Sequence, residues 1–114
     1  MKITKFEDIM SWQKSHLFTV EIYKVFHDCK DYSFRDQIRR ASVSIMSNIA
    51  EGFERGTNNE FKHFLYIAKG SSAEVRSLLI LALSVGYIPQ NKFNELLSVA
   101  VDISRLISSL IKTL

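Results

Sequence analysis

The chain has 114 residues, of which 46% are hydrophobic and 24% charged, a balance that excludes a disordered chain and leaves room for one folded domain with one core. Its net charge of +3 is compatible with nucleic-acid binding but does not require it. The single cysteine, Cys29, excludes an internal disulfide and a cysteine-based zinc site. Because no segment approaches the roughly 20 apolar residues of a membrane span and the N-terminus lacks the apolar core of a signal peptide, we expect a cytoplasmic protein with no membrane partner.

The first helix is predicted over about residues 6–29 and carries two apolar stripes on nearly opposite sides. The first stripe has the i, i+3, i+4 spacing of a core face and consists of Ile9, Trp12, His16, Val20 and Tyr23. The second stripe consists of Phe18, Ile22, Val25 and Cys29, with Phe26 between the two stripes. Since the helix of a monomeric bundle needs one apolar stripe, the second predicts burial against another molecule.

The second helix is predicted over about residues 34–53, and polar side chains line the border of its apolar face. At 100° per residue, one narrow stripe contains Gln37, Arg40, Ser44, Asn48 and Glu51. Apolar residues lie directly beside this stripe. The polar side chains therefore lie at the edge of the buried face, and their role has to be explained.

The third helix is predicted over about residues 58–85. Thr57 and Glu60 have the spacing of a capping box at its start, and Gly86 with Pro89 ends it. Its final segment, LLILAL, is apolar all round, which predicts that this end of the helix is enclosed on every side.

The fourth helix is predicted over about residues 91–112 and is apolar over more than half of its circumference. Four helices with short connections predict an all-α, antiparallel up-down-up-down four-helix bundle, a single domain over residues 1–114. The excess apolar surface predicts a homo-oligomer, with a monomer that has an apolar exterior as the alternative. The predicted interface residues are Phe18, Ile22, Val25, Phe26, Ile80, Leu81, Ile103 and Leu110.

Two central motifs carry a resemblance to a known family. QIRRASVSIMSNIAEG and FKHFLYIAKGSSAE, followed by GYI and preceded by a helix with Trp12 and Tyr23, resemble the 23S ribosomal RNA intervening-sequence proteins. The one departure is Met46-Ser47, where the family pattern has a small residue or proline. The resemblance implies a cytoplasmic bacterial protein that forms a ring-shaped homopentamer. It also implies relatedness to the accessory proteins of diversity-generating retroelements, whose basic surface engages nucleic acid and a reverse transcriptase.

The polar stripe of the second helix has a partner stripe on the third helix, where Gly70 would allow close approach of the two backbones. The predicted structural network comprises Gln37, Arg40, Ser44, Asn48, Glu51, His63 and Glu74. In antiparallel packing Glu51 would approach His63, and Arg40 would pair with Glu74. The alternative is a catalytic site of Glu51, His63 and Glu74. We favour the structural network, and expect no enzyme, cofactor or metal site, because no nucleophile–base pair, glycine-rich phosphate loop or Glu-x-x-His motif is present.

Basic residues recur on the outer sides of the second and third helices, and we expect both sets to share one outer wall. The candidate nucleic-acid-binding residues are Arg35, Arg39, Lys62, Lys69 and Arg76. One interpretation is a solvated helix face, and the other is a surface that follows a phosphate backbone. Apart from Tyr66, no aromatic residue of the third helix is interleaved with these side chains to stack bases.

We therefore expect a non-enzymatic, homo-oligomeric scaffold. The resemblance, rather than the chemistry of the basic residues, implies RNA or other nucleic acid as its partner, bound through the basic outer faces. The alternative is a protein–protein adaptor for a partner enzyme such as a reverse transcriptase, without direct nucleic-acid binding.

Overall fold

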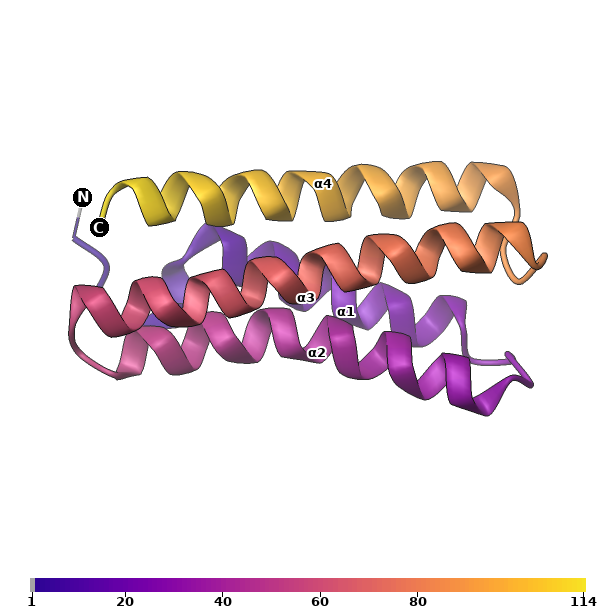
Figure 1. The fold of residues 1–114 in the computed structure, drawn as a ribbon, viewed down its shortest axis with the longest axis horizontal. Coiled ribbons are helices and arrows are strands. Elements are labelled where there is room, and N and C mark those ends of the chain that lie inside the picture. Colours follow the sequence, from indigo (N-terminus) through magenta and orange to yellow (C-terminus); the bar gives the residue numbers. More distant parts are fainter. Residues whose placement is uncertain (1) are drawn as a thin grey trace.

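The computed structural model describes residues 2–114 as an antiparallel bundle of four long helices with overall dimensions of 43 × 22 × 19 Å. A short 3-10 helix, η1 (Phe6–Asp8), precedes α1 (Met10–Val25), α2 (Tyr32–Glu54), α3 (Asn58–Ser84) and α4 (Gln90–Lys112). Each helix packs against its two neighbours in the order α1, α2, α3, α4 and back to α1 (Figure 1). The predicted all-α four-helix fold is thus confirmed, and residues 2–114 contain no strand.

Local capping explains where the central helices begin. The Asp31 carboxylate accepts a hydrogen bond from the Phe34 backbone N–H at 3.1 Å, so α2 starts at Tyr32, two residues before the predicted position. The Thr57 hydroxyl accepts from the Glu60 backbone N–H at 3.2 Å, which confirms the predicted helix start with Thr57 as its N-cap.

Two glycines in left-handed conformations allow the chain to turn after α2 and after α3. Gly56 has φ +90° and Gly86 has φ +83°, values that other residues adopt only with strain. The turn at Gly56 connects α2 to α3 at one end of the bundle, and the turn at Gly86 connects α3 to α4 at the other end, where the α1–α2 connection also lies (Figure 1).

The predicted first helix over residues 6–29 is wrong at both ends. Ile9 has extended backbone angles, φ −76° and ψ 122°, which separate η1 from α1 and let its side chain enter the core. Trp12 then packs edge-on against Phe6, with ring centroids 5.2 Å apart. At the other end α1 stops at Val25, and the following residues form the turn to α2.

Four residues of the predicted oligomer interface lie in the core of the protomer. Phe18, Ile22, Phe26 and Ile103 are at most 3% exposed, so this part of the interface prediction is wrong. On α1, the stripe with Phe18 and Ile22 faces the other helices, whereas Val20 of the predicted core stripe is exposed.

The residues between the core side chains of α1 explain which stripe is buried. Ser11, Ser15 and Thr19 share the buried side, and their small size lets α1 approach α2 closely. The Thr19 hydroxyl lies 2.8 Å from the Ser15 carbonyl oxygen and 3.2 Å from that of Ser42 on α2, so its donor is satisfied. The other stripe contains His16 and Tyr23, whose polar groups remain in water on the outer side.

The close approach between α2 and α3 occurs at a different glycine from the one predicted. A Cβ atom at Gly52 would lie 2.5 Å from Phe64 Cβ, whereas a Cβ at Gly70 would meet nothing within 4 Å. The prediction for Gly70 is therefore wrong, because this residue lies on the exposed side of α3.

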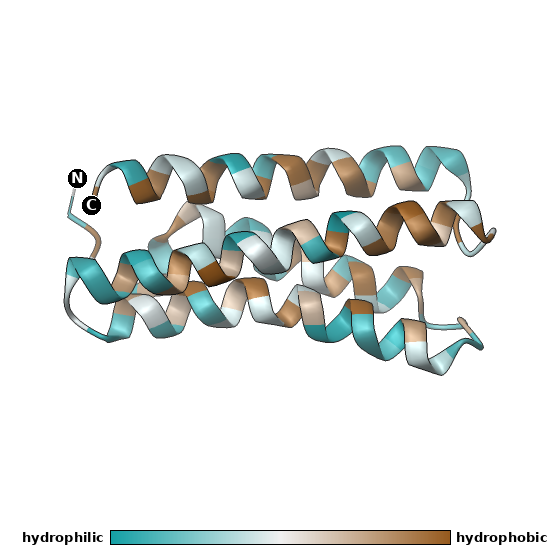
Figure 2. Cartoon of the chain, viewed as in Figure 1, coloured by the Kyte–Doolittle hydropathy of each residue, from teal (hydrophilic) through white to brown (hydrophobic). Residues whose placement is uncertain are grey.

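The apolar C-terminal segment of α3 is not enclosed within the protomer. Ile80 is 54% exposed, Leu81 48% and Val85 52%, while the flanking Leu79 and Ala82 are fully buried. Figure 2 shows this part of α3 as a hydrophobic stretch that continues around the helix. The segment therefore gives the molecule an exposed apolar ridge, defined by Ile80, Leu81 and Val85.

Candidate nucleic-acid interface

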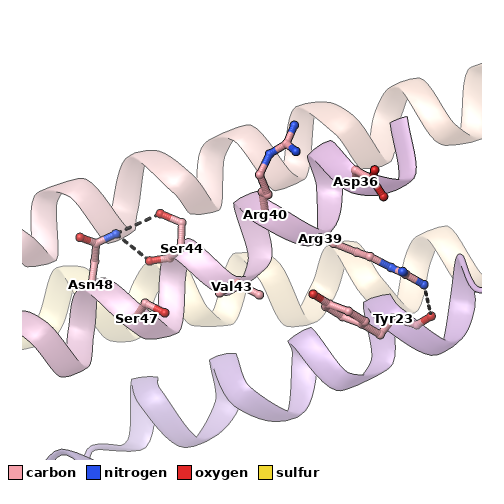
Figure 3. Close-up of a pocket in the computed structure, with 8 residues that line it drawn as sticks. All are labelled: Tyr23, Asp36, Arg39, Arg40, Val43, Ser44, Ser47 and Asn48. Atoms are coloured by element: carbon pink, nitrogen blue, oxygen red, sulfur yellow. Dashed lines mark hydrogen bonds between the residues drawn. The ribbon is translucent and has the colours of Figure 1, made fainter. Parts of the chain in front are cut away.

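Arg35 and Arg39 lie along the edge where α1 and α2 meet, and each guanidinium covers a tyrosine ring. The Cζ atom of Arg39 is 4.5 Å from the ring centroid of Tyr23, and the Cζ atom of Arg35 is 4.7 Å from that of Tyr32. Arg39 Nη2 also donates to the Tyr23 carbonyl oxygen at 3.2 Å (Figure 3). Cation–π contacts of this kind contribute about 0.5–1 kcal/mol at exposed sites. Both guanidinium groups are therefore held in defined positions at the surface.

The two tyrosines remain accessible beside these arginines. Tyr23 is 42% exposed and Tyr32 is 56% exposed. Neither tyrosine is predicted from the sequence as part of a basic surface. Tyr23 belongs to α1 and meets Arg39 only through the register of two helices. Tyr32 could have been found from its position three residues before Arg35, near the start of the same helix. We call the set of Tyr23, Tyr32, Arg35 and Arg39 the arginine–tyrosine edge.

Two shallow grooves meet at Tyr23 and Arg39. The larger has a volume of about 610 Å³ and runs along the outer face of α2 (Figure 3). It is lined by Tyr23, Asp36, Arg39, Arg40, Val43, Ser44, Ser47 and Asn48. The second, of about 570 Å³, is lined by Tyr23, Lys24, His27, Asp28 and Arg39. The edge thus combines cations, aromatic rings and polar side chains within an open surface.

Part of the predicted polar network is present between α2 and α3. The hydroxyl groups of Ser44 and Ser71 lie 2.8 Å apart and share a hydrogen bond. Asn48 Nδ2 donates to the carbonyl oxygen and the hydroxyl of Ser44, at 2.8 and 3.0 Å (Figure 3). Gln37 Nε2 donates to Glu74 Oε2 at a longer 3.4 Å. The half-buried Ser44–Ser71 bond and the exposed Gln37–Glu74 bond join the two helices, while the Asn48 bonds to Ser44 lie within α2.

The two predicted charged contacts of this network are absent from residues 2–114. Glu74 accepts from Gln37 and not from Arg40, whose side chain is exposed. Glu51 pairs with Arg55 one turn further along α2, at 3.3 Å, and His63 is exposed without a carboxylate contact. Because these groups are solvated, no burial forces them to pair across the helices. The arrangement provides no acid–base constellation of Glu51, His63 and Glu74.

Lys62, Lys69 and Arg76 lie on the opposite edge of the bundle from the arginine–tyrosine edge. On α3, Ser71 faces α2, whereas the Ser72 hydroxyl lies 3.4 Å from a carbonyl oxygen of α4. When α3 is viewed along its axis, the three basic residues lie beyond Ser72 on the side away from Ser71. They therefore lie on the α4 side of the helix. Because Arg39 contacts α1 and these residues border α4, the expectation of one shared outer wall is wrong.

An apolar groove of about 340 Å³ lies between α1 and α4, the neighbouring pair with the least extensive contact. It is lined by Lys14, Leu17, Phe18, Glu21, Lys92, Glu95, Leu96 and Val99. Lys92 Nζ at its rim lies 2.9 Å from Glu95 and 3.4 Å from Glu21. Hydrogen bonds to Glu95 and, secondarily, to Glu21 raise the pKa of Lys92, so this ion pair persists through neutral pH. Leu17, 68% exposed, extends the apolar surface beyond the groove.

Of the predicted interface residues, Ile80 and Leu81 are exposed on the apolar ridge, while Val25 and Leu110 are half-buried.

Within residues 2–114, no three side chains of histidine, cysteine, aspartate or glutamate come together in a way that could hold a metal ion. None of the helices in this part of the chain combines the length and the apolar character needed to cross a membrane.

Residues 7–109 match the family described as "23S rRNA-intervening sequence protein". The chain belongs to this family. A crystal structure of a protein of unknown function from the S23 ribosomal protein family, from Bacteroides thetaiotaomicron, has the same fold, with a TM-score of 0.85 and 26% sequence identity. The similarity covers 93% of this chain and 98% of that chain. The comparison with curated proteins found no match. The predicted resemblance to the 23S rRNA-intervening sequence proteins is thus confirmed as family membership, over nearly the full length of the bundle.

Proposed function

We propose that the protein is a non-enzymatic, homo-oligomeric scaffold of the cytoplasm that binds nucleic acid through its basic edges. The observation that carries this proposal is the arginine–tyrosine edge, where Arg35 and Arg39 are held in place beside open grooves. Fixed cations on an accessible surface neutralise phosphates and release their counterions, which is the main source of affinity for nucleic acid. The family description names an intervening sequence of ribosomal RNA, so RNA is the first ligand to test.

The proposal includes self-assembly, because the protomer exposes two unlike apolar surfaces. One is the α1–α4 groove with Leu17, and the other is the ridge of Ile80, Leu81 and Val85 on α3. Because the two surfaces are unlike and belong to different helices, a contact between the groove of one copy and the ridge of the next is head-to-tail, and it closes into a ring when the rotation permits. The family resemblance described above makes a pentamer the expected ring. Five copies would carry five times the +3 charge of one chain and bind a long polyanion multivalently.

Nucleic-acid binding is tested by filter binding of a structured RNA at two salt concentrations. We expect binding at low salt that weakens as salt rises, because each neutralised phosphate contributes to the salt slope. The double variant Arg35→Gln/Arg39→Gln should bind more weakly and with a shallower slope than the wild type. Lys62→Gln/Lys69→Gln removes the same charge from the opposite edge and should weaken binding to a smaller extent, because neither lysine is held over an aromatic ring in the described part of the chain. Absence of binding at low salt would overturn the proposal, and binding without salt dependence would contradict its electrostatic basis.

The α1–α4 groove supports a second candidate, a protein–protein adaptor for a partner enzyme such as a reverse transcriptase. Its apolar floor and charged rim resemble the grooves that receive an amphipathic helix. The two candidates separate in the same experiment, because an adaptor without direct nucleic-acid contact does not retain RNA on the filter.

A further inference from the structure

We propose that the arginine–tyrosine edge recognises unpaired bases, so that the nucleic acid bound there is single-stranded. This inference rests on the proposed nucleic-acid binding and adds the class of ligand. It starts from the two cation–π pairs, which lie one helical turn apart because Arg35 and Arg39 are four residues apart on α2.

Each pair offers flat surfaces on which a base can stack. A guanidinium plane and a tyrosine ring both stack on nucleobases, and this contact contributes about 1–3 kcal/mol per base. Arg39 is fixed over Tyr23 by its bond to the Tyr23 carbonyl oxygen, so its plane needs little ordering when a base arrives. Tyr32 is more than half exposed and leaves part of its ring open beside Arg35. Two neighbouring stacking positions therefore exist before the ligand binds.

The groove next to Arg39 can receive a base that is flipped out of the stack of its strand. Its volume of about 610 Å³ lies within the usual range of small-ligand sites. Its lining includes the exposed Ser47 and the half-buried Asn48. Since Asn48 Nδ2 already donates to Ser44, the Ser47 hydroxyl and the Asn48 amide oxygen are the groups available to the polar edge of a base (Figure 3). In a duplex these base edges are paired and the faces are stacked on their neighbours, so a duplex could not use either feature.

The distribution of charge along this edge also favours bases over a continuous phosphate track. Asp28 and Asp36 line the two grooves beside the arginines, and the Asp36 carboxylate lies 3.4 Å from Arg35 Nε. Acidic groups at these positions would repel the closely spaced phosphates of a duplex lying flat on the surface. The opposite edge differs, because neither Lys62 nor Lys69 forms a cation–π pair with an aromatic ring in the described part of the chain.

The test compares labelled oligonucleotides by fluorescence anisotropy: an unstructured RNA strand, the DNA strand of the same sequence, and the RNA duplex. We expect the single strands to bind more tightly than the duplex, and a difference between RNA and DNA would reveal contacts to the 2′-hydroxyl. Tyr23→Leu/Tyr32→Leu keeps all charges and should weaken single-strand binding about tenfold, with duplex binding unchanged.

A second variant replaces the two planar guanidinium groups with ammonium groups, which keeps the charge and leaves both tyrosines in place. Arg35→Lys/Arg39→Lys should lose single-strand affinity while its salt slope stays that of the wild type. The control Lys62→Gln/Lys69→Gln should weaken both probes equally. Equal affinity for duplex and single strand, or unchanged single-strand affinity in both edge variants, would overturn this inference and leave the proposed function standing. Failure of every probe to bind at low salt would overturn both.

Discussion

Asp31 forms two hydrogen bonds that join separate turns of the bundle. One carboxylate oxygen accepts from the Phe34 N–H at the start of α2, and the other accepts from the Tyr87 hydroxyl at 2.7 Å, in the α3–α4 turn. These bonds favour the carboxylate, so the pKa of Asp31 lies below its usual 3.8, with Tyr87 as the main cause and Phe34 as the second. The same bond to Asp31 is the main cause that raises the pKa of Tyr87 above its usual 10.0.

The Asp31–Tyr87 link stabilises the fold over a limited range of pH. A carboxyl group with a lowered folded pKa contributes stability that is complete above 3.8 and is lost as the pH falls through the folded value. A phenol with a raised folded pKa contributes stability that is complete below 10.0 and is lost as the pH rises through the folded value. The link is therefore intact at neutral pH.

We predict that Tyr87→Phe lowers the melting temperature by a few degrees at pH 7 and by less near pH 2. The substitution keeps the packing of the ring on Phe34 and removes only the hydroxyl, so the loss reports the bond to the Asp31 carboxylate. Protonation of Asp31 weakens that bond in the wild type and narrows the difference between the two proteins. Thermal unfolding followed by circular dichroism measures the difference in melting temperature between the wild type and the variant at each pH. Equal differences at the two pH values would show that the charge of Asp31 does not contribute.

At the scale of whole helices, the contact between α2 and α3 depends on the absence of a side chain at Gly52. We predict that Gly52→Ala destabilises the protein by about 1–3 kcal/mol, because the new Cβ would overlap Phe64 Cβ at 2.5 Å. The gain in helix propensity, about 1 kcal/mol, is too small to offset this overlap. Urea unfolding gives the free energy directly.

Gly70→Ala is the matched control for this prediction. The same substitution within α3 meets nothing within 4 Å, so it should stabilise the protein by about 0.5–1 kcal/mol. Stabilisation by both substitutions would mean that the backbones of α2 and α3 do not approach as closely at Gly52 as the structure has them.

The comparison between these glycines illustrates what the sequence could predict. Helix ends depend on neighbouring residues, so the Thr57–Glu60 capping box and the turn at Gly86 could be identified from the chain alone. Gly52 and Gly70 are both glycines within helical sequences, and only the packing of α2 on α3 distinguishes the one that needs to be small.

The two apolar stripes of α1 were not distinguishable by spacing, because both have helical periodicity. The decisive feature is that small hydroxyl residues accompany the buried stripe, and Thr19 reaches the Ser42 carbonyl oxygen of α2. The candidate site has the same limitation: Arg39 was expected on an outer face, but its contact with Tyr23 depends on the register of α1 against α2. Family membership, in contrast, could be predicted from the ordered motifs of α2 and α3.

At the scale of the whole molecule, the proposed assembly depends on two apolar surfaces that belong to different helices. The α1–α4 groove includes Leu17, and the ridge on α3 includes Ile80 and Leu81. In a head-to-tail contact the groove of one copy receives the ridge of the next, so each copy uses both surfaces once. A symmetric dimer would use both surfaces only if the groove and the ridge of one copy met the ridge and the groove of the other at the same time.

We predict that Leu17→Glu and Ile80→Glu/Leu81→Glu each yield monomers of 13.1 kDa. Every contact in the ring joins a groove to a ridge, so a charge in either surface disrupts all of the contacts. Mixing the two variants should give a heterodimer, since the first retains an intact ridge and the second an intact groove. Light scattering coupled to size exclusion after nuclease treatment measures these masses. Asn59→Glu, which adds the same charge at an exposed position near the start of α3, should assemble like the wild type. A wild type that stays at 13.1 kDa at high concentration would contradict self-assembly, and variants that remain monomeric when mixed would contradict the head-to-tail arrangement.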